Sequence, residues 1–157
     1  MKKKIILICS DGGHLAQILE LKELFIQYDY LIITEGTEAT FPLKKKYNVC
    51  YLKSRPEGGK RSITFIFSLF INLFLSFRLL ISHYPKVIIT TGSHTAVPIC
   101  LLGKLFRVKI VWILSFARIN TRAKSANFIY PIADKFIVQW ESAQALYPRS
   151  IYLGGLY

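Results

Sequence analysis

The stretch Ser10-Asp11-Gly12-Gly13-His14-Leu15 joins a continuous apolar run to an amphipathic pattern, and this junction decides the fold. The run before it, residues 5–9 (IILIC), is typical of a central parallel strand that is covered on both faces. Two adjacent glycines allow a tight turn and a close backbone approach, and the helix start that follows presents unpaired N–H groups. The stretch therefore predicts a strand, a turn and a helix, with phosphate or another anion as the ligand that the turn would favour.

The ligand of this turn stays open on local grounds. The turn has neither the G-x-G-x-x-G spacing of a dinucleotide site nor the Gly-Lys-Ser/Thr of a P-loop, and a tight turn that binds nothing fits it equally well. His14 favours a site, because its imidazole titrates near physiological pH and follows a first strand, where doubly wound folds bind ligands. Asp11 opposes phosphate binding unless its carboxylate is protonated, paired or turned away.

Composition narrows the class of protein. The 157 residues suffice for a single domain, 1–157, with a core of its own. Lys and Arg number 21 against 9 Asp and Glu, and the formal net charge of +12 favours an anionic partner. A hydrophobic content of 52% and a mean hydropathy of +0.36 favour an anionic membrane surface. The absence of zinc spacing, RNA-binding motifs and helix-turn-helix patterns argues against nucleic acid.

The cysteines and the amino-terminal residues indicate the compartment. Cys9, Cys50 and Cys100 are widely spaced, so we expect buried thiols in a reducing compartment, with no disulfide frame, metal site or cofactor. The basic residues 2–4 precede only a short apolar run, which does not make a signal peptide. The sequence thus predicts a cytosolic domain.

Further along the chain, apolar runs alternate with helical patterns, which predicts a Rossmann-like α/β fold with a doubly wound, mainly parallel sheet. We expect helices over residues 14–27, 36–47, 63–82 and 96–106. We expect strands near residues 4–10, 30–34, 49–53, 86–91, 109–114, 135–140 and 150–153.

The helix expected over 63–82 is unusually apolar. Residues 63–77 carry no charge, which is shorter than the roughly 20 residues that a membrane span needs. A core helix is one interpretation. The other, which we favour, is a membrane-associating helix that packs one side on the sheet and lies with the rest in the interface, between the basic flanks Lys60, Arg61 and Arg78. A thin polar stripe recurs every four residues on a helix that is otherwise apolar nearly all round, and it offers water only four small polar groups: Thr64, Ser68, Asn72 and Ser76.

A second glycine turn, Gly92-Ser93-His94-Thr95, follows the strand expected at 86–91. Ser93 is a candidate N-cap, and His94 places another imidazole near a helix start. Because both turns follow parallel strands, we expect His14 and His94 to converge on one crevice. After the strand at 109–114, three cations could bind phosphate or form a solvated basic loop: Arg118, Arg122 and Lys124. His83 receives no role.

Four segments together resemble the bacterial polysaccharide-biosynthesis proteins of the PssD/CpsF type, and through them the membrane-recruiting subunit of the two-chain GlcNAc transferase of dolichol-linked oligosaccharide synthesis. They are residues 12–15 (GGHL), 90–94 (TTGSH), 115–118 (SFAR) and 130–141 (YPIADKFIVQWE). The resemblance covers essentially the whole chain, and the segment Tyr130 to Glu141 is its most specific part. More distantly, the chain is similar to the amino-terminal half of MurG-type GT-B glycosyltransferases. Asp11 and Leu114 depart from the family pattern, since a small residue and a carboxylate are expected there.

The resemblance implies a function. The domain would be the acceptor-side half of a GT-B enzyme, whose donor-binding half comes from a separate subunit. The pair would transfer a sugar from a shared nucleotide-sugar to a lipid-pyrophosphate-linked acceptor at the cytoplasmic membrane face, in capsule or exopolysaccharide synthesis, and this chain alone would be inactive. His14 would act as base or position the acceptor, and other residues would bind substrate: Gly12, Gly13, Ser93, His94, Arg118 and Glu141.

Two other functions remain open. The chain could be a non-catalytic membrane adaptor that recruits and stabilises a catalytic chain while its glycine turns bind nothing. It could also be a stand-alone domain that binds a nucleotide or a nucleic acid, for which strong and salt-sensitive binding would be diagnostic.

Overall fold

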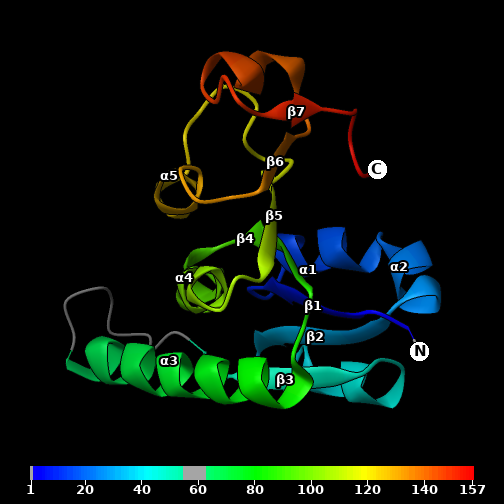
Figure 1. Cartoon of the computed structure of the whole chain (residues 1–157), viewed down its shortest axis with the longest axis vertical. Helices are drawn as coiled ribbons and strands as arrows, with labels where there is room; N and C mark the ends of the chain where they lie inside the picture. The colour runs from blue at the N-terminus through cyan, green and yellow to red at the C-terminus, as the bar shows by residue number, and fades with distance from the viewer. Residues whose placement is uncertain (1, 55–62) are drawn as a thin grey trace.

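The computed structural model describes residues 2–54 and 63–157, which form one parallel seven-stranded sheet with helices on both faces (Figure 1). The spatial order is β3-β2-β1-β4-β5-β6-β7, and the neighbouring strands run parallel. The predicted Rossmann-like doubly wound α/β fold is therefore confirmed. The strands are β1 (Lys4–Cys9), β2 (Asp29–Glu35), β3 (Val49–Leu52), β4 (Val87–Gly92), β5 (Lys109–Ile113), β6 (Lys135–Val138) and β7 (Ile151–Tyr152).

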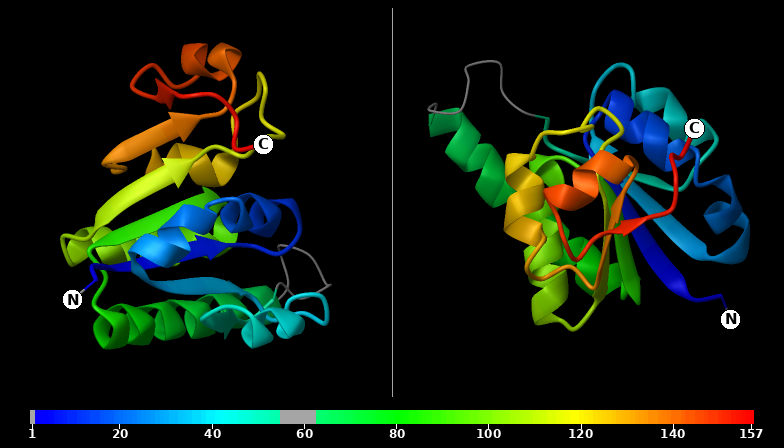
Figure 2. Two further views of the ribbon diagram at one scale, coloured as in Figure 1. Left: turned by 90° about the vertical axis from the view of Figure 1, so that its right-hand side faces the viewer. Right: turned by 90° about the horizontal axis from the view of Figure 1, so that it is seen from above.

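The helices cover the sheet in two layers. α1 and α2 lie on one face, and α3, α4 and α5 lie on the other (Figure 2, right). The α-helices are α1 (Gly13–Leu19), α2 (Lys22–Gln27), α3 (Ile63–His83), α4 (Val97–Leu105) and α5 (Lys124–Ile129). Short 3₁₀ helices are η1 (Phe41–Lys45), η2 (His94–Ala96) and η3 (Glu141–Ala145).

The central strand β1 divides its apolar side chains between these layers. Ile6 and Ile8 are buried in the cluster beneath α3 and α4, whereas Ile5, Leu7 and Cys9 are buried in the cluster beneath α1. Alternate residues of a strand point to opposite faces, so a strand covered on both sides must be apolar at every position. This explains the uninterrupted run that precedes the first glycine turn.

Two of the three cysteines are buried, as expected. Cys9, Cys50 and Cys100 are free; the first and last are buried, and Cys50 is half-buried. Burial raises the pKa of Cys9 and of Cys100 to about 12, so both thiols stay protonated at neutral pH.

The connections of β1 create the switch point of the sheet. From β1 the chain proceeds outward to β2 and β3, then returns through α3 to β4 on the other side of β1. The carboxyl ends of β1 and β4 therefore lie side by side with their following segments departing in different directions, which leaves a crevice between them.

The expected strands all appear within a few residues of their predicted bounds, but the single helix expected over 14–27 is wrong. It breaks between α1 and α2, where Leu21 has a non-helical ψ of 40°. Leu24 follows Leu15 by nine positions, which is half a turn out of phase at 3.6 residues per turn. The break allows Leu21 and Leu24 to pack on the same cluster as Leu15.

Two other predicted helices are shorter than expected. The 36–47 segment contains only the 3₁₀ helix η1, with Pro42 in its first turn, and α4 begins at Val97 after the 3₁₀ turn η2. The N-cap role expected of Ser93 is also wrong. Its hydroxyl makes no capping bond and instead lies 3.2 Å from Nδ1 of His94.

The polar stripe of helix α3 lies on its inward side. Ser68 and Ser76 are buried, and the Asn72 amide bonds the backbone of Lys53 in both directions, with bonds of 2.9 Å to its N–H and its carbonyl oxygen. The described members of the stripe therefore face the protein, where small polar groups allow close packing. The outward face carries large apolar residues, of which Phe67, Phe70 and Phe74 are 62%, 65% and 67% exposed.

The structure describes only part of the predicted membrane segment. Residues 55–62 of the predicted polar loop, with Lys60 and Arg61, and the side chain of Thr64 lie outside the described residues. Within the described ranges, none of the helices combines the length and the hydropathy required to cross a membrane.

Candidate functional site

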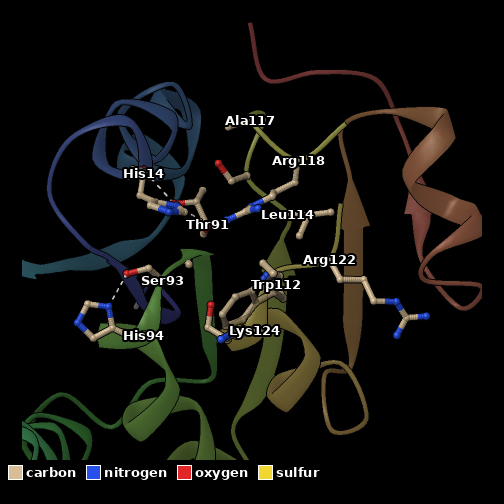
Figure 3. Close-up of a pocket in the computed structure, with 14 residues that line it drawn as sticks. His14, Thr91, Ser93, His94, Trp112, Leu114, Ala117, Arg118, Arg122 and Lys124 are labelled. Carbon is tan, nitrogen blue, oxygen red and sulfur yellow. Dashed lines mark hydrogen bonds between the residues drawn. The ribbon is translucent and has the colours of Figure 1, made fainter. Parts of the chain in front are cut away.

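Two glycine turns meet at the switch point and enclose a cavity of about 570 Å³ (Figure 3). The backbone N–H of Ser10, after β1, donates to the carbonyl oxygen of Gly92, at the end of β4, at 3.3 Å. The third wall comes from the segment that follows β5. The residues that line the cavity are His14, Thr91, Gly92, Ser93, His94, Trp112, Leu114, Ser115, Ala117, Arg118, Arg122, Ala123, Lys124 and Ser125.

Two hydrogen bonds with Thr91 hold His14 against the end of β4. Its Nδ1 lies 2.7 Å from the carbonyl oxygen of Thr91, and the Thr91 hydroxyl donates to the carbonyl oxygen of His14 at 2.8 Å. Because a carbonyl oxygen only accepts, Nδ1 carries the proton of the neutral ring. The lone pair of that ring therefore lies on Nε2, which is the nitrogen that could accept a proton.

The surroundings keep this imidazole neutral. Burial lowers the pKa of His14 below its ordinary value, and the charge of Arg118 adds to this effect, while the bond to Thr91 partly opposes it. Figure 3 shows the Arg118 side chain directed across the cavity toward His14. A neutral histidine with its lone pair on Nε2 is a competent general base at neutral pH.

Gly92 makes this arrangement possible, although the sequence did not single it out as a site residue. Its φ of +105° is a conformation that side chains rarely adopt. A Cβ at this position would lie 3.0 Å from Cε1 of His14 and 3.6 Å from Cζ2 of Trp112. Because Gly92 has no side chain, the imidazole of His14 fits between the two strand ends.

His94 lines the same cavity as His14, which confirms that the two histidines converge on one crevice. Its Nε2 lies 4.0 Å from Oε1 of Glu35, at the end of β2, and that oxygen also accepts a bond from the Thr95 hydroxyl. Sequence reasoning missed Glu35. The available signal was its position as the last polar residue before the chain leaves a strand next to β1.

The three cations of the 118–124 segment do not act together. Arg118 points into the cavity, but the Arg122 guanidinium is directed away from it and lies 5.5 Å from the ring centre of Tyr147 (Figure 3). The Arg122 guanidinium therefore does not converge with that of Arg118. All three residues line the cavity, and Arg118 and Lys124 supply its positive charge.

Trp112 forms part of the cavity wall and was also missed. Its ring is 1% exposed and stacks parallel to that of Phe136 at a centroid distance of 6.5 Å. Its indole Nε1 is buried and has no hydrogen-bond partner within the described part of the chain. An indole N–H in an apolar strand gave no signal in the sequence, because buried tryptophans are common core residues.

Three predicted site residues do not line this cavity: Gly12, Gly13 and Glu141. Glu141 is exposed at the start of η3. At the first turn, Asp11 Oδ1 accepts the Gly12 N–H at 2.6 Å, and Oδ2 accepts the Thr37 hydroxyl at 2.6 Å. The carboxylate of Asp11 thus accepts the Gly12 N–H, a group that the glycine turn was expected to offer to an anion.

The other departure, Leu114, is buried and lines the cavity with an apolar side chain. Its carbonyl oxygen accepts a bond of 2.8 Å from the amide of Gln139. Across residues 2–54 and 63–157, no group of three or more His, Cys, Asp or Glu side chains is placed to hold a metal ion.

A parallel sheet with its cavity at this switch point defines a Rossmann-like domain of the kind that forms one half of a GT-B glycosyltransferase. MurG of Acinetobacter baumannii has the same fold, with a TM-score of 0.77, 16% identity and coverage of 98% of this chain but 45% of MurG. UDP-N-acetylglucosamine 2-epimerase from Rickettsia bellii gives a TM-score of 0.75 at 12% identity, covering 99% of this chain and 46% of that one. These likenesses concern the fold alone, and the chain spans less than half of either protein.

The family described as "Oligosaccharide biosynthesis protein Alg14 like" matches residues 5–156, and the chain belongs to this family. Relatives named "UDP-N-acetylglucosamine transferase subunit ALG14" include those of Mus musculus and Rattus norvegicus. The mouse protein is 28% identical over 179 residues, covering 96% of this chain and 82% of its own length. The rat protein is 30% identical over 175 residues, covering 96% and 81%. The predicted resemblance to this type of subunit is thus confirmed for the family, through eukaryotic relatives.

Proposed function

We propose that this chain is the acceptor-side, membrane-recruiting subunit of a two-component glycosyltransferase. The observation that carries the proposal is His14, a neutral imidazole with its lone pair on Nε2, in the cavity at the switch point of a GT-B-like half. The relatives named as UDP-N-acetylglucosamine transferase subunits support a nucleotide-sugar donor. The resemblance of four sequence segments to bacterial polysaccharide-biosynthesis proteins supports capsule or exopolysaccharide synthesis as the proposed setting.

In the proposed reaction, an acceptor hydroxyl attacks the anomeric carbon of the donor sugar. The new glycosidic C–O bond forms as the bond between that carbon and the nucleotide diphosphate breaks, and the diphosphate leaves with the electron pair. His14 Nε2 takes the hydroxyl proton, which raises the nucleophilicity of the oxygen. Arg118 lines the same cavity and would hold a phosphate of the lipid-pyrophosphate-linked acceptor by charge-assisted hydrogen bonds.

The donor would be bound mainly by a separate subunit that closes the cavity from the open edge of the sheet. The carboxyl-terminal segment supports an interface there, because Leu153 and Tyr157 are 76% and 67% exposed. Tyr157 also packs edge-on against Phe116, with ring centroids 5.4 Å apart, which links this segment to the loop that carries Arg118. Amphipathic and apolar side chains of this kind are enriched in protein interfaces.

The outward face of α3 would attach the complex to the cytoplasmic face of the membrane. Phe67, Phe70 and Phe74 form an exposed apolar stripe on a chain of net charge +12, and anionic lipid complements both features. Peripheral attachment would place the cavity near a lipid-linked acceptor.

The second candidate, a non-catalytic membrane adaptor, is favoured by one observation. Asp11 occupies the Gly12 N–H, so the first glycine turn has less capacity to bind an anion than its sequence suggested. In that function the chain would recruit and stabilise a partner that supplies every catalytic group.

The test is reconstitution of the full chain with its donor-binding partner on anionic liposomes, with radiolabelled UDP-N-acetylglucosamine and a lipid-pyrophosphate-linked acceptor. Transfer is expected from the pair and not from this chain alone. Transfer by the isolated chain would overturn the two-component function. Full activity of an intact His14→Ala complex would favour the adaptor.

A further inference from the structure

A second cavity, of about 320 Å³, lies at the opposite edge of the sheet from His14. It is bounded by the end of α3 and the residues that lead into β4, and by the turn from α4 into β5. Because β4 has six residues at about 3.3 Å each, the two cavities are separated by roughly 20 Å. This cavity is therefore distinct from the proposed acceptor site.

The floor of the second cavity is apolar and continues onto the exposed face of α3. Leu80 is buried at its base, and Ile81 and Phe106 line it while remaining 54% and 48% exposed. The ring of Phe106 lies 5.9 Å from that of Phe77 on α3. A ligand in the cavity would thus share one continuous apolar surface with the face that we propose to lie in the membrane interface.

The rim of the cavity is positively charged. Lys86 and Arg107 both line it and are exposed, and its described lining contains no acidic residue. The ammonium of Lys86 lies 5.6 Å from the ring centre of Tyr84, which also lines the cavity. Two cations above an apolar floor complement an anionic headgroup that is joined to a hydrocarbon chain.

Two residues that line this cavity, Tyr84 and Arg107, have a positive φ, which is uncommon outside glycine. Tyr84 follows the end of α3 with a φ of +53°, and Arg107 follows α4 with a φ of +59°. The N–H of Val108 bonds the Gly103 carbonyl oxygen at 2.8 Å, which makes Arg107 the helix-terminating position where glycine is the usual residue. Strained residues of this kind cluster at binding sites, where their side chains are needed.

We propose that this cavity binds the head of one anionic phospholipid. Its phosphate lies between Lys86 and Arg107, and the first part of an acyl chain lies over Leu80, Ile81 and Phe106. The inference deepens the proposed membrane attachment and rests on it for its biological setting. Free inorganic phosphate would use only the rim, whereas a phospholipid uses the rim and the apolar floor together.

The experiment measures binding of monomeric dioctanoyl phosphatidylglycerol to the full chain by titration calorimetry at fixed ionic strength. Dioctanoyl phosphatidylcholine has the same acyl chains without the net negative charge, and inorganic phosphate tests the phosphate group alone. Saturable binding of the phosphatidylglycerol is expected, with at least tenfold weaker binding of both other probes. Equal binding of inorganic phosphate would replace the lipid site by a simple anion site, and equal binding of phosphatidylcholine would remove the role of the cations.

Charge variants locate the site. The pair Lys86→Gln and Arg107→Gln is expected to weaken phosphatidylglycerol binding about tenfold or more. The matched pair Lys135→Gln and Arg149→Gln removes the same charges from another exposed position on the sheet edge and should change affinity less than twofold. Equal losses in the two pairs would show that overall charge alone attracts the lipid, and would overturn the site.

The variant Arg107→Gly distinguishes a loss of lipid affinity from a loss of folding stability. Glycine tolerates a φ of +59°, so this variant should raise the thermal midpoint while it weakens phosphatidylglycerol binding. Unchanged lipid affinity would contradict the proposal. Replacement of the three phenylalanines of α3 by serine should abolish vesicle flotation but preserve binding of the monomeric lipid, so failure of membrane attachment and failure of this site remain distinguishable.

Discussion

The side-chain amide of Gln139 donates a hydrogen bond of 2.6 Å to Oε1 of Gln17, joining α1 to the segment after β6 across 122 positions of the sequence. Both side chains are 3% exposed. Gln17 Oε1 also accepts the N–H of Phe116, and Gln139 Oε1 accepts the N–H of Leu156, at 3.0 Å each. This buried pair thus connects the helix that carries His14, the cavity loop and the carboxyl-terminal segment.

Loss of this pair should destabilise the whole domain. Gln139→Ala leaves the Leu114 carbonyl and the Leu156 N–H without their partner, and the expected loss in the free energy of unfolding is about 2 kcal/mol. Urea denaturation measures it. The control is Gln27→Ala on the exposed face of α2, for which a change within about 0.5 kcal/mol is expected. Equal stabilities of the two variants would mean that the buried pair contributes nothing.

Substitution of His14 should affect turnover more than folding. His14→Asn keeps an amide donor near the Thr91 carbonyl but removes the base, so turnover of the assembled complex should fall about 10²–10⁴-fold with little change in stability. His14→Ala should lose the same activity and some stability. His94→Ala serves as comparison and should have a smaller effect. A reduction below threefold in His14→Asn would leave the imidazole a packing role only.

The pH dependence of stability should report the lowered pKa of His14. Its folded pKa lies below the ordinary value of 6.5, so the unfolded chain takes up this proton first as the pH falls. The contribution of His14 to the free energy of unfolding is therefore complete above pH 6.5 and is lost as the pH falls toward the folded pKa. The difference in urea midpoint between wild type and His14→Asn, followed from pH 8 to pH 5, measures it. A difference that stays constant would contradict the lowered pKa.

Gly92→Ala should displace the imidazole of His14. The new Cβ would lie 3.0 Å from Cε1 of His14 at a φ of +105°, and we expect a loss of about 1–3 kcal/mol in the free energy of unfolding together with a fall in turnover. Gly13→Ala provides the control for stability, since a Cβ there meets no atom within 4 Å. Wild-type stability and turnover in Gly92→Ala would show that His14 does not depend on this close approach.

The outward face of α3 should determine membrane attachment. Replacement of Phe67, Phe70 and Phe74 by serine is expected to move the purified chain from the floating to the soluble fraction with anionic liposomes at low salt. The control replaces Ile26 and Phe128, each 73% exposed on other helices, by serine and should leave flotation unchanged. Flotation of both variants alike would remove α3 as the contact.

The sequence predicted most of the fold because local patterns carried it. The apolar runs located the strands, and the turns at 10–15 and 92–95 located the two strand ends that form the cavity. Periodicity did not predict the break at Leu21, since the side chains of α1 and α2 pack on one cluster only when the helix is interrupted. It also gave no orientation for α3, because a helix that is apolar nearly all round has no unique inward side.

The sequence by itself determined that the chain is a parallel α/β domain, that His14 and His94 each follow a strand at the same edge of the sheet, and that the chain resembles the family to which it belongs. Only the tertiary structure decided which groups touch. The contact of His14 with Thr91 spans 77 positions, Glu35 reaches Thr95 across 60, and Gln17 meets Gln139 across 122. Such pairs depend on strand order and on the absence of a side chain at Gly92. Those are properties of the assembled sheet, because local propensity acts only between residues that are close in the sequence.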